Sequence, residues 1–320
     1  MHLEHDSASI YVAGHTGLVG SAVVRALGAS GFHNTVCRTS SELDLRRQEA
    51  VEEFFSEQKP EFVVVAAARV GGILANSQSP VEFLADNLEI QTNIIRSAAR
   101  YDVKRLVFLG SSCVYPKLAP QPLTEDSLLT GPLESTNEWY AVAKIAGIKM
   151  CEAYARQYGK DFVSLMPTNL YGPGDNFDLE TSHVLPAMIR KFHEAKRSGP
   201  DRNVELWGSG SPMREFLHVD DMAAACVHIL RAEEEQIDRA APRRLLNVGT
   251  GSDISIRGLA ELIRRTVGAH NPIVWDADKP DGTPRKLMDV TRLNSLGWTA
   301  SIPLADGIRS TYEWYLQSQD

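Results

Sequence analysis

Tyr140 and Lys144 stand four residues apart in the stretch TNEWYAVAK. The run over 138–158 predicts a helix, and this spacing puts both side chains on one of its faces. Asn137 or Thr136 is expected to cap the start of that helix. A lysine beside a tyrosine favours the phenolate, so we expect Lys144 to lower the pKa of Tyr140 below its usual value of about 10. Such a tyrosine gives a proton to a carbonyl oxygen, or takes one from an alcohol, near neutral pH.

The stretch LGSSCVYPK, residues 109–117, brings two more reactive side chains to the end of an apolar run. Ser111 ends the predicted strand, where its hydroxyl can donate a second hydrogen bond to the oxygen that Tyr140 serves. Cys113 follows two residues later. Taken alone, Cys113 is best interpreted as a small buried apolar residue, as free cysteines commonly are.

Gly14, Gly17 and Gly20 form a GxxGxxG pattern directly after the first predicted strand. Glycine permits a tight turn, lets the backbone approach a pyrophosphate, and lets the following helix pack closely on the sheet. The N-terminus of that helix then faces the anion. The pattern therefore predicts a dinucleotide site; the alternative is a purely structural turn.

Arg38 lies near the end of the second predicted strand, in VCRTSSE, where a cofactor with a free ribose 2′-hydroxyl usually meets an acidic residue. A guanidinium suits a 2′-phosphate and so favours NADP. The alternative is a solvated charge at a strand end. Asp44 is a weaker candidate for a place beside the adenine.

The elements that must position these residues alternate between short apolar runs and amphipathic runs. In chain order we predict a strand in SIYVAG, a helix at 18–30, a strand in TVCRT, a helix at 46–58, a strand in EFVVVAAA, a helix around 88–101, a strand in RLVFLGSS, the helix at 138–158 and a strand in FVSLMPTN. This alternation predicts an α/β fold with a parallel sheet and right-handed crossovers.

The alternation breaks near residue 174, where proline and glycine become frequent. We predict an NADP-binding domain over 1–174 and a smaller substrate domain over 175–320, with 216–250 returning to the first domain. The segment RAEEEQIDRAAPRR, residues 231–244, is predicted to be a solvated charged loop.

The composition is that of an ordinary globular protein: 320 residues, 43% of them hydrophobic, with a net charge of −8. The negative charge argues against nucleic acid as a partner, and the lack of an apolar run of about 18 residues argues against a membrane span. The chain starts without a signal-peptide pattern, and its cysteines form no CxxC pair. We expect a reduced, cytoplasmic protein without metal, with buried unreactive roles for Cys37, Cys151 and Cys226.

Seven blocks, in order along nearly the whole chain, resemble the extended short-chain dehydrogenase/reductase family. They are GHTGLVG, LGSSCVYPK, EWYAVAKIAGIK, MPTNLYGPGDNF, SHVLPA, WGSGSPMREFLHVDDMA and KPDGTPRKLMDVTRL. The resemblance implies a Rossmann-type doubly wound parallel sheet with a smaller, mostly C-terminal α/β substrate domain. Within the family the blocks are most similar to bifunctional enzymes that invert C3 and C5 of GDP-4-keto-6-deoxy-D-mannose and reduce C4 with NADPH, giving GDP-L-fucose.

The resemblance also implies roles for individual residues. The reductase triad would be Ser111, Tyr140 and Lys144, and the epimerisation pair Cys113 and His183. The contacts to the GDP-sugar would be Lys191, Trp207, Arg214 and Asp281. Besides Arg38, the contacts to NADP(H) would be Gly14, His15, Thr16, Gly17, Leu18, Val19, Gly20, Leu109, Gly110, Ser111, Ser112, Lys144, Pro167, Thr168, Asn169, Leu170 and His183.

The chain departs from the family at Thr16 and Ser40, where bacterial members carry arginines near the 2′-phosphate. This difference reduces the expected preference for NADP over NAD. The resemblance further implies a homodimer that packs through the helices around 88–101 and 138–158.

The implied chemistry accounts for the cysteine. C3 and C5 both flank the C4 carbonyl, so their hydrogens become acidic once that oxygen is polarised by Ser111 and Tyr140. Each inversion needs a base on one face and an acid on the other, and a thiol and an imidazole both titrate within reach of neutral pH. The sequence leaves open which of Cys113 and His183 is the acid, and in which order the two carbons invert.

The two phosphates of such a substrate require a local gathering of positive charge. The basic residues expected to face the cleft are Arg190, Lys191, Arg214, Arg285 and Lys286, of which two or three would converge on the pyrophosphate. Trp207 is expected either to stack on guanine or to pack in the core.

Two other functions compete with this interpretation. An NAD-retaining 4-epimerase or dehydratase of the same family is the first, but such dehydratases carry an Asp-Glu pair where this chain has Cys113 and Val114, and in a 4-epimerase the thiol would have no role. The second is a non-catalytic NADP-sensing module, which predicts loss of a triad that is present here.

Overall fold

The computed structural model of the protein describes residues 7–279 and 281–319. The first six residues, which contribute to the prediction of no N-terminal signal, lie outside this range. The strands are β1 (Ile10–Ala13), β2 (Thr35–Val36), β3 (Phe62–Val65), β4 (Arg105–Leu109), β5 (Phe162–Pro167), β6 (Asn169–Tyr171), β7 (Val204–Trp207), β8 (Met213–Arg214), β9 (Phe216–His218), β10 (Leu245–Val248), β11 (Ile254–Ser255), β12 (Ile273–Asp276) and β13 (Arg285–Lys286).

The helices alternate with these strands in the first half of the chain. They are α1 (Leu18–Ala29), α2 (Gln48–Gln58), α3 (Ile73–Gln78), α4 (Pro80–Arg100), α5 (Glu138–Tyr158), α6 (Val184–Ser198), α7 (Val219–Arg231), α8 (Glu234–Ala240), α9 (Ile256–Val267), α10 (Thr291–Ser295) and α11 (Leu304–Gln317), with short 3-10 turns η1 (Ser112–Val114), η2 (Glu125–Ser127) and η3 (Ser135–Asn137).

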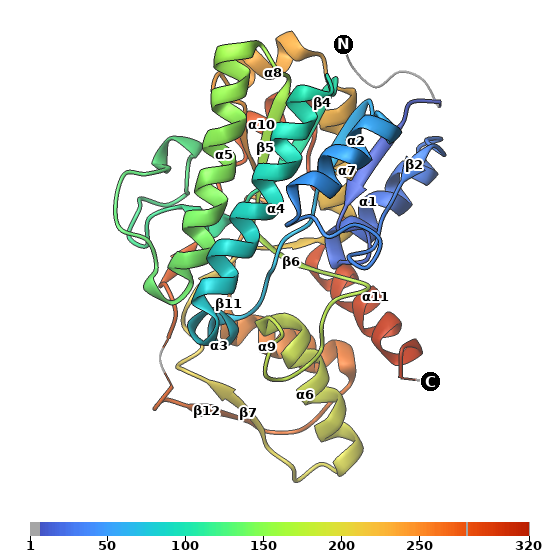
Figure 1. The fold of residues 1–320 in the computed structure, drawn as a ribbon. Helices are drawn as coiled ribbons and strands as arrows, with labels where there is room; N and C mark the ends of the chain where they lie inside the picture. The colour runs from blue at the N-terminus through green and yellow to red at the C-terminus, as the bar shows by residue number, and fades with distance from the viewer. Residues whose placement is uncertain (1–6, 280, 320) are drawn as a thin grey trace.

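Six strands form one parallel sheet in the order β10-β5-β4-β3-β1-β2. Alternate residues of β1 enter two different cores, since Ile10 and Val12 pack with α1 and α7, whereas Tyr11 and Ala13 pack with α2, α4 and α5. Figure 1 shows α4 and α5 running side by side across one face of this sheet. Covered on both faces, the sheet confirms the predicted doubly wound α/β fold.

A smaller unit, seen in the lower part of Figure 1, is built around α6, α9 and the parallel pair β7–β12. Its core joins Ile189 and Phe192 of α6 to Ile263 of α9 and Ile308 of α11. A second small sheet in the order β11-β8-β13 lies beside it. We keep the division into two domains as a proposal, in which 216–250 belongs to the first unit because α7 packs on α1 and β10 pairs with β5.

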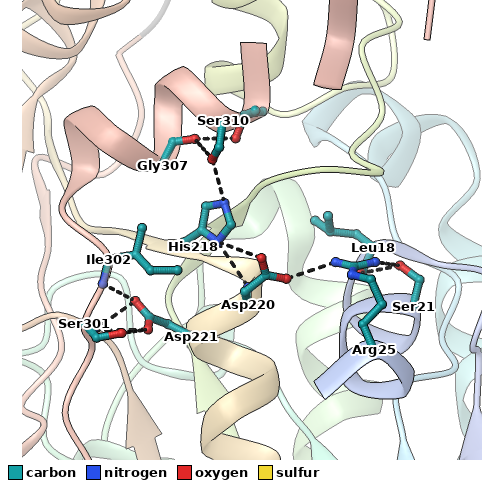
Figure 2. Close-up of polar contacts among 11 residues, drawn as sticks. Leu18, Ser21, Arg25, His218, Asp220, Asp221, Ser301, Ile302, Gly307 and Ser310 are labelled. Carbon is teal, nitrogen blue, oxygen red and sulfur yellow. Dashed lines mark hydrogen bonds and ion pairs between the residues drawn. The ribbon is translucent and has the colours of Figure 1, made fainter. Parts of the chain in front are cut away.

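The start of α7 connects the two units (Figure 2). The ring of His218 caps the helix, because its Nδ1 accepts a hydrogen bond from the backbone N–H of Asp220 at 3.2 Å. The Nε2 of the same ring lies 3.4 Å from the hydroxyl of Ser310 on α11. The carboxylate of Asp220 in turn accepts from Arg25 on α1 at 2.9 Å. The N-terminal end of α7 therefore contacts both α1 and the C-terminal helix α11.

The next residue, Asp221, fixes the chain that leads into α11 (Figure 2). Its buried carboxylate accepts hydrogen bonds from the backbone N–H groups of Ser301 at 3.1 Å and Ile302 at 3.0 Å, and from the Ser301 hydroxyl at 2.9 Å. A buried carboxylate with this many donors is fully compensated for the loss of water.

The prediction of a loop over 231–244 is wrong, although most of the segment's charged residues are exposed to solvent as predicted. Residues Glu234–Ala240 form α8, and Ile237 on it is fully buried. Arg244 is also buried, where it donates to Asp161 at 2.5 Å. Arg244 also pairs with Glu234 and Asp238, so part of the segment's charge belongs to an ion-pair network that reaches Arg105 on β4 through Asp161.

The limits of two other elements differ from the prediction. Helix α4 begins at Pro80, eight residues earlier than expected, and the second strand spans only Thr35–Val36. Among the residues that the structure describes, no helix is long and apolar enough to cross a bilayer, and no group of His, Cys, Asp or Glu side chains has the arrangement of a metal site.

Candidate active site

A cleft of about 1840 Å³ separates the carboxyl ends of β1, β3, β4 and β5 from the smaller unit. Two of the predicted cofactor residues, His15 and Gly20, do not line it. All the other residues predicted to bind cofactor or substrate or to act in catalysis line the cleft: Gly14, Thr16, Gly17, Leu18, Val19, Arg38, Leu109, Gly110, Ser111, Ser112, Cys113, Tyr140, Lys144, Pro167, Thr168, Asn169, Leu170, His183, Lys191, Trp207, Arg214 and Asp281. Residues predicted from blocks far apart in the chain thus meet on one surface.

Ser111 and Cys113 stand where β4 ends and the 3-10 turn η1 begins. The Ser111 hydroxyl oxygen accepts a hydrogen bond from the backbone N–H of Cys113 at 3.3 Å, so the serine caps the turn that carries the cysteine. That bond does not use the hydroxyl hydrogen of Ser111, which points to the thiol of Cys113 and acts to lower the thiol's pKa. Cys113 is 7% exposed, and burial raises the pKa of its thiol, although the charges of Lys286 and Lys144 act in the opposite direction.

Tyr140 and Lys144 both face the cleft from the first two turns of α5. The ammonium of Lys144 donates to the backbone oxygen of Leu109 at 2.8 Å and lies 5.8 Å from the centre of the Tyr140 ring. Burial lowers the pKa of Lys144 to about 8, and burial raises the pKa of Tyr140 well above its usual value. The prediction that Lys144 lowers the pKa of Tyr140 is therefore wrong: here the phenol keeps its proton and the lysine is the group poised near neutral pH.

Neither predicted cap holds the start of α5. Asn137 occupies the capping position, but its side chain makes no capping hydrogen bond, and a turn of 3-10 helix containing Thr136 precedes it. The far end behaves as the sequence indicates, because Gly159 takes the left-handed conformation that ends many helices.

The glycine turn has the shape of a phosphate cradle. Gly14 has φ of +82°, and a Cβ built there would lie 2.7 Å from the backbone nitrogen of Ala67, so only glycine fits. Gly20 allows α1 to press against the turn, since a Cβ there would collide with the carbonyl oxygen of Gly14. Gly17 caps α1 without any side chain, which leaves the first N–H groups of the helix facing the cleft. These residues fit the pyrophosphate of a dinucleotide.

Arg38 lies on the rim of the cleft beyond this turn. Its guanidinium donates a hydrogen bond to the backbone oxygen of Cys37 at 2.8 Å and lies 5.7 Å from the centre of the Phe54 ring. This geometry orients Arg38 at the cleft wall, next to Ser40. Asp44 also lines the cleft, but its carboxylate is held by Arg46 through two hydrogen bonds of 2.9 Å.

His183 stands at the capping position of α6 and lines the same cleft as Ser111, Tyr140 and Lys144. Its ring is exposed within the cleft, and the enclosing protein lowers its pKa by desolvation. Lys191, two turns further along α6, donates to the backbone oxygen of Glu205 at 2.9 Å, and desolvation lowers the pKa of its ammonium as well.

The outer wall of the cleft is formed by β7, β8 and the segment before β13. Trp207 is 63% exposed there, with the ammonium of Lys279 located 5.5 Å from its ring centre, so a place in the core is excluded. Asp281 accepts from the backbone N–H and the hydroxyl of Ser209 at 2.9 and 2.7 Å. Arg214 donates to the backbone oxygen of Met213 at 2.8 Å.

The five basic residues expected near the cleft behave differently from one another. Lys191, Arg214, Arg285 and Lys286 line it, but Arg285 is bound to Asp253 at 2.5 Å. Arg190 does not line the cleft and is bound to Glu194 at 2.7 Å and to the backbone of Phe177. The local gathering of positive charge therefore rests on Lys191, Arg214 and Lys286.

Sequence reasoning missed part of the wall because its residues carry no motif. The segment 66–72 after β3 lines the cleft, together with Asn76, Asn137 and Ser182. The signal that could have found 66–72 is its position, since ligands in such folds bind beyond the carboxyl ends of the strands.

Glu215 was also missed, although it follows Arg214 directly. Its fully buried carboxylate accepts from the backbone N–H groups of Thr250 at 2.6 Å, Gly251 at 2.7 Å and Met288 at 2.9 Å. Its backbone oxygen accepts from Asn169 at 2.7 Å. It thereby holds several pieces of the cleft wall in place.

A doubly wound sheet with a glycine cradle and a Ser-Tyr-Lys set at one cleft defines a nicotinamide-dependent oxidoreductase or epimerase of the short-chain type. The chain belongs to the NAD dependent epimerase/dehydratase family, whose model matches residues 10–249.

Individual proteins show the same relationship. GDP-L-fucose synthase 1 of Arabidopsis thaliana is 58% identical over 312 residues, covering 98% of this chain and 94% of that protein. GDP-L-fucose synthase of Escherichia coli (strain K12) is 54% identical, covering 97% of each chain. The crystal structure of a GDP-L-fucose synthetase from Naegleria fowleri bound to NADP superposes with a TM-score of 0.87 at 28% identity, covering 100% of this chain and 97% of that one.

Proposed function

We propose that the chain is a GDP-L-fucose synthase that converts GDP-4-keto-6-deoxy-D-mannose to GDP-L-fucose with NADPH. The observation that carries the proposal is the place of Cys113, which lies two residues past Ser111 in the same cleft as Tyr140 and Lys144, with His183 facing them from the other unit. The full-length similarity to proteins of that name supports it.

The reaction requires a donor cluster at the C4 oxygen of the sugar. Ser111 would turn its hydroxyl hydrogen from the Cys113 thiol to the C4 oxygen, and Tyr140 keeps a phenolic proton, because burial raises its pKa. Together they stabilise the enolate oxygen while C3 and C5 exchange protons. Cys113 and His183 are the proposed acid–base pair for those exchanges, supplied from opposite sides of the cleft.

Reduction then uses the same cluster. NADPH, when bound, would supply a hydride to C4 of the sugar, and Tyr140 would give its proton to the C4 oxygen. Lys144, anchored on the Leu109 carbonyl, places a positive charge beside the tyrosine, and its lowered pKa makes that charge sensitive to pH. Gly14, Gly17 and the N-terminus of α1 are the proposed holders of the cofactor's pyrophosphate.

We propose NADP rather than NAD as the cofactor. Arg38 at the cleft rim is the proposed partner of the 2′-phosphate, and no acidic side chain directly precedes or follows it in the strand end. Ser40 and Thr16 line the same rim and add hydroxyl donors in place of guanidinium groups.

The GDP part of the substrate is proposed to lie along the outer wall. Lys191 and Arg214 would bind the pyrophosphate, with Lys286 beside them. The exposed ring of Trp207 suits stacking on guanine, and Asp281 can accept from the base. The two acidic positions that a dehydratase needs are held by Cys113 and by the fully buried Val114, which disfavours that alternative.

A homodimer in the cytoplasm is part of the proposal. Helices α4 and α5 pack on each other, and their outer faces carry the exposed apolar side chains Val81, Trp139 and Val142. A second copy that covers these faces would remove them from water.

The direct test is incubation with GDP-4-keto-6-deoxy-D-mannose and NADPH, followed by identification of the sugar. GDP-L-fucose is expected; a 4-reduced sugar with C3 and C5 unchanged would overturn the epimerase assignment. In deuterated water, Cys113→Ser should slow deuterium incorporation at C3 and C5 about 100-fold, while reducing an already epimerised ketone at close to the normal rate. Equal loss of both steps would show that the substitution had damaged the shared pocket instead.

A further inference from the structure

We propose that Asn76, Asn137 and Ser182 form a subsite that recognises hydroxyl groups of the substrate's sugar. The inference rests on the proposed function and deepens it, by naming the side chains that select the sugar ring rather than the nucleotide. All three residues line the cleft.

Each of the three carries a buried oxygen without a hydrogen-bond partner in the described part of the chain: Asn76 Oδ1, Asn137 Oδ1 and Ser182 Oγ. Buried polar atoms are nearly always paired, and leaving one unpaired is costly. Three such atoms in residues of one cleft wall indicate a partner that the protein itself does not provide, and because each atom is sealed from solvent, its side chain must turn toward the cleft to meet that partner.

The three residues form a continuous wall although they come from different parts of the chain. Helix α3, which carries Asn76, packs against η3, which ends at Asn137. A Cβ built on Gly72 would lie 3.5 Å from the carbonyl oxygens of both Thr181 and Ser182, so the start of α3 also contacts the segment that holds Ser182.

This wall reaches both halves of the proposed catalytic set. Asn137 precedes Tyr140 by three residues at the start of α5, and Ser182 directly precedes His183 at the start of α6. The wall therefore adjoins, along the chain, one residue of each half of the proposed catalytic set, and Tyr140 and His183 line the same cleft.

The chemistry of the unpaired atoms identifies the kind of group they bind. The amide nitrogen of Asn76, which is only 3% exposed, already donates to the carbonyls of Gly71 at 2.9 Å and Gly72 at 3.1 Å. Its Oδ1 is therefore an acceptor that needs a donor. The Oδ1 of Asn137 makes no capping bond and is likewise an acceptor without a donor.

Hydroxyl groups satisfy this requirement and phosphates do not. The phosphate oxygens of a nucleoside diphosphate are anionic acceptors at neutral pH and would repel carbonyl oxygens, whereas sugar hydroxyls donate. Ser182 can accept or donate, and because its residue is partly exposed to the cleft, a change of its χ1 rotamer brings the hydroxyl to the cleft surface.

The neighbouring residue gives a matched control. The hydroxyl of Thr181 donates to Asp178 at 2.9 Å and accepts from Asn176 at 2.9 Å, so it is fully paired, and it does not line the cleft. Ser182→Ala removes an unpaired oxygen; Thr181→Val removes a paired one. A sugar subsite predicts opposite consequences for these adjacent positions.

The test measures affinities for GDP-L-fucose and for GDP by calorimetry, together with thermal melting. Ser182→Ala and Asn137→Ala should each reduce the preference for GDP-L-fucose over GDP by about three- to tenfold, with the affinity for NADPH unchanged. Ser182→Ala should melt at the same temperature as the unsubstituted protein or higher. Thr181→Val should melt lower and keep the full preference for GDP-L-fucose.

An unchanged preference for GDP-L-fucose in both cleft variants would overturn the proposal and would mean that water alone satisfies these atoms. Because the readout is a difference between two ligands, it does not depend on turnover. Failure of the subsite is thus distinguishable from failure of the proposed function, which is judged by the sugar product formed from GDP-4-keto-6-deoxy-D-mannose.

Discussion

Two polar regions of the molecule are organised in opposite ways. At the start of α7, the buried carboxylate of Asp221 accepts hydrogen bonds from Ser301 and Ile302, and the ring of His218 is used at both nitrogens (Figure 2). Along the cleft wall, by contrast, Asn137 and Ser182 leave buried oxygens unpaired.

The difference separates scaffold from site. Polar groups that hold two units together are satisfied within the protein, because unpaired ones would reduce its stability. Polar groups that bind a ligand lower the stability of the free protein while they are unpaired, and they gain hydrogen bonds when the ligand binds. Substitutions at the start of α7 should therefore change stability, and substitutions in the cleft should change binding and turnover.

The largest effect on activity with the smallest effect on stability is expected from a substitution of Tyr140. Tyr140→Phe removes the proton donor and leaves the ring in place, so the rate of ketone reduction should fall by about a thousandfold while the free energy of unfolding stays nearly constant. Steady-state kinetics and chemical denaturation measure the two quantities. Full reductase activity in this variant would refute the role of the phenol.

The opposite pattern is expected at Asp221. Asp221→Ala leaves the N–H groups of Ser301 and Ile302 without an acceptor, and the free energy of unfolding should fall by about 3 kcal/mol with the KM values for cofactor and sugar unchanged. Asp220→Ala is the control, because that exposed residue pairs with Arg25 at the surface and should cost less than about 1 kcal/mol. Equal losses in the two variants would contradict the distinction drawn here.

A smaller effect is expected at the cleft rim. Arg38→Ala should raise the KM for NADPH about tenfold and leave the KM for NADH nearly unchanged, because only NADPH carries the 2′-phosphate. Comparison of the two cofactors in the same variant controls for damage to the fold. If both KM values rise together, the 2′-phosphate site lies elsewhere.

The smallest effect concerns pH. The pKa of Lys144 is lowered to about 8, so its positive charge is present below that pH and is lost as pH rises through it. Tyr140 has a raised pKa and stays protonated over the same range. We expect kcat/KM for reduction to decline several-fold between pH 7.5 and about 9. A decline that Lys144→Arg shifts upward would sharpen the assignment, and a flat profile to pH 9.5 would contradict it.

Local patterns predicted much of the fold. The 138–158 helix was predicted with its observed bounds, because its periodicity is uninterrupted and Gly159 ends it. The parallel sheet followed from continuous apolar runs, such as Phe62–Val65 and the four residues after Arg105. The segment 231–244 was misjudged because its charges find partners such as Asp161, more than 70 residues away in the chain.

In the candidate site, too, features carried by local sequence motifs could be predicted and features that depend on the folded chain could not. Residues carried by motifs, such as Ser111 and Tyr140, could be predicted to meet in one cleft. The direction of the Tyr140 pKa could not, because burial outweighs the neighbouring lysine and burial is a property of the folded chain. Neither could the unpaired oxygen of Ser182, since pairing depends on every neighbour at once.

The turn formed by Gly14 and Gly20 has a consequence for anyone who wishes to redesign this enzyme. Neither position can accept even a methyl group without a collision, so this turn, the floor of the proposed cofactor site, cannot be altered by substituting these glycines. A variant that runs on NADH would have to be sought among the rim residues 38–41, which line the cleft and whose replacement leaves that floor untouched.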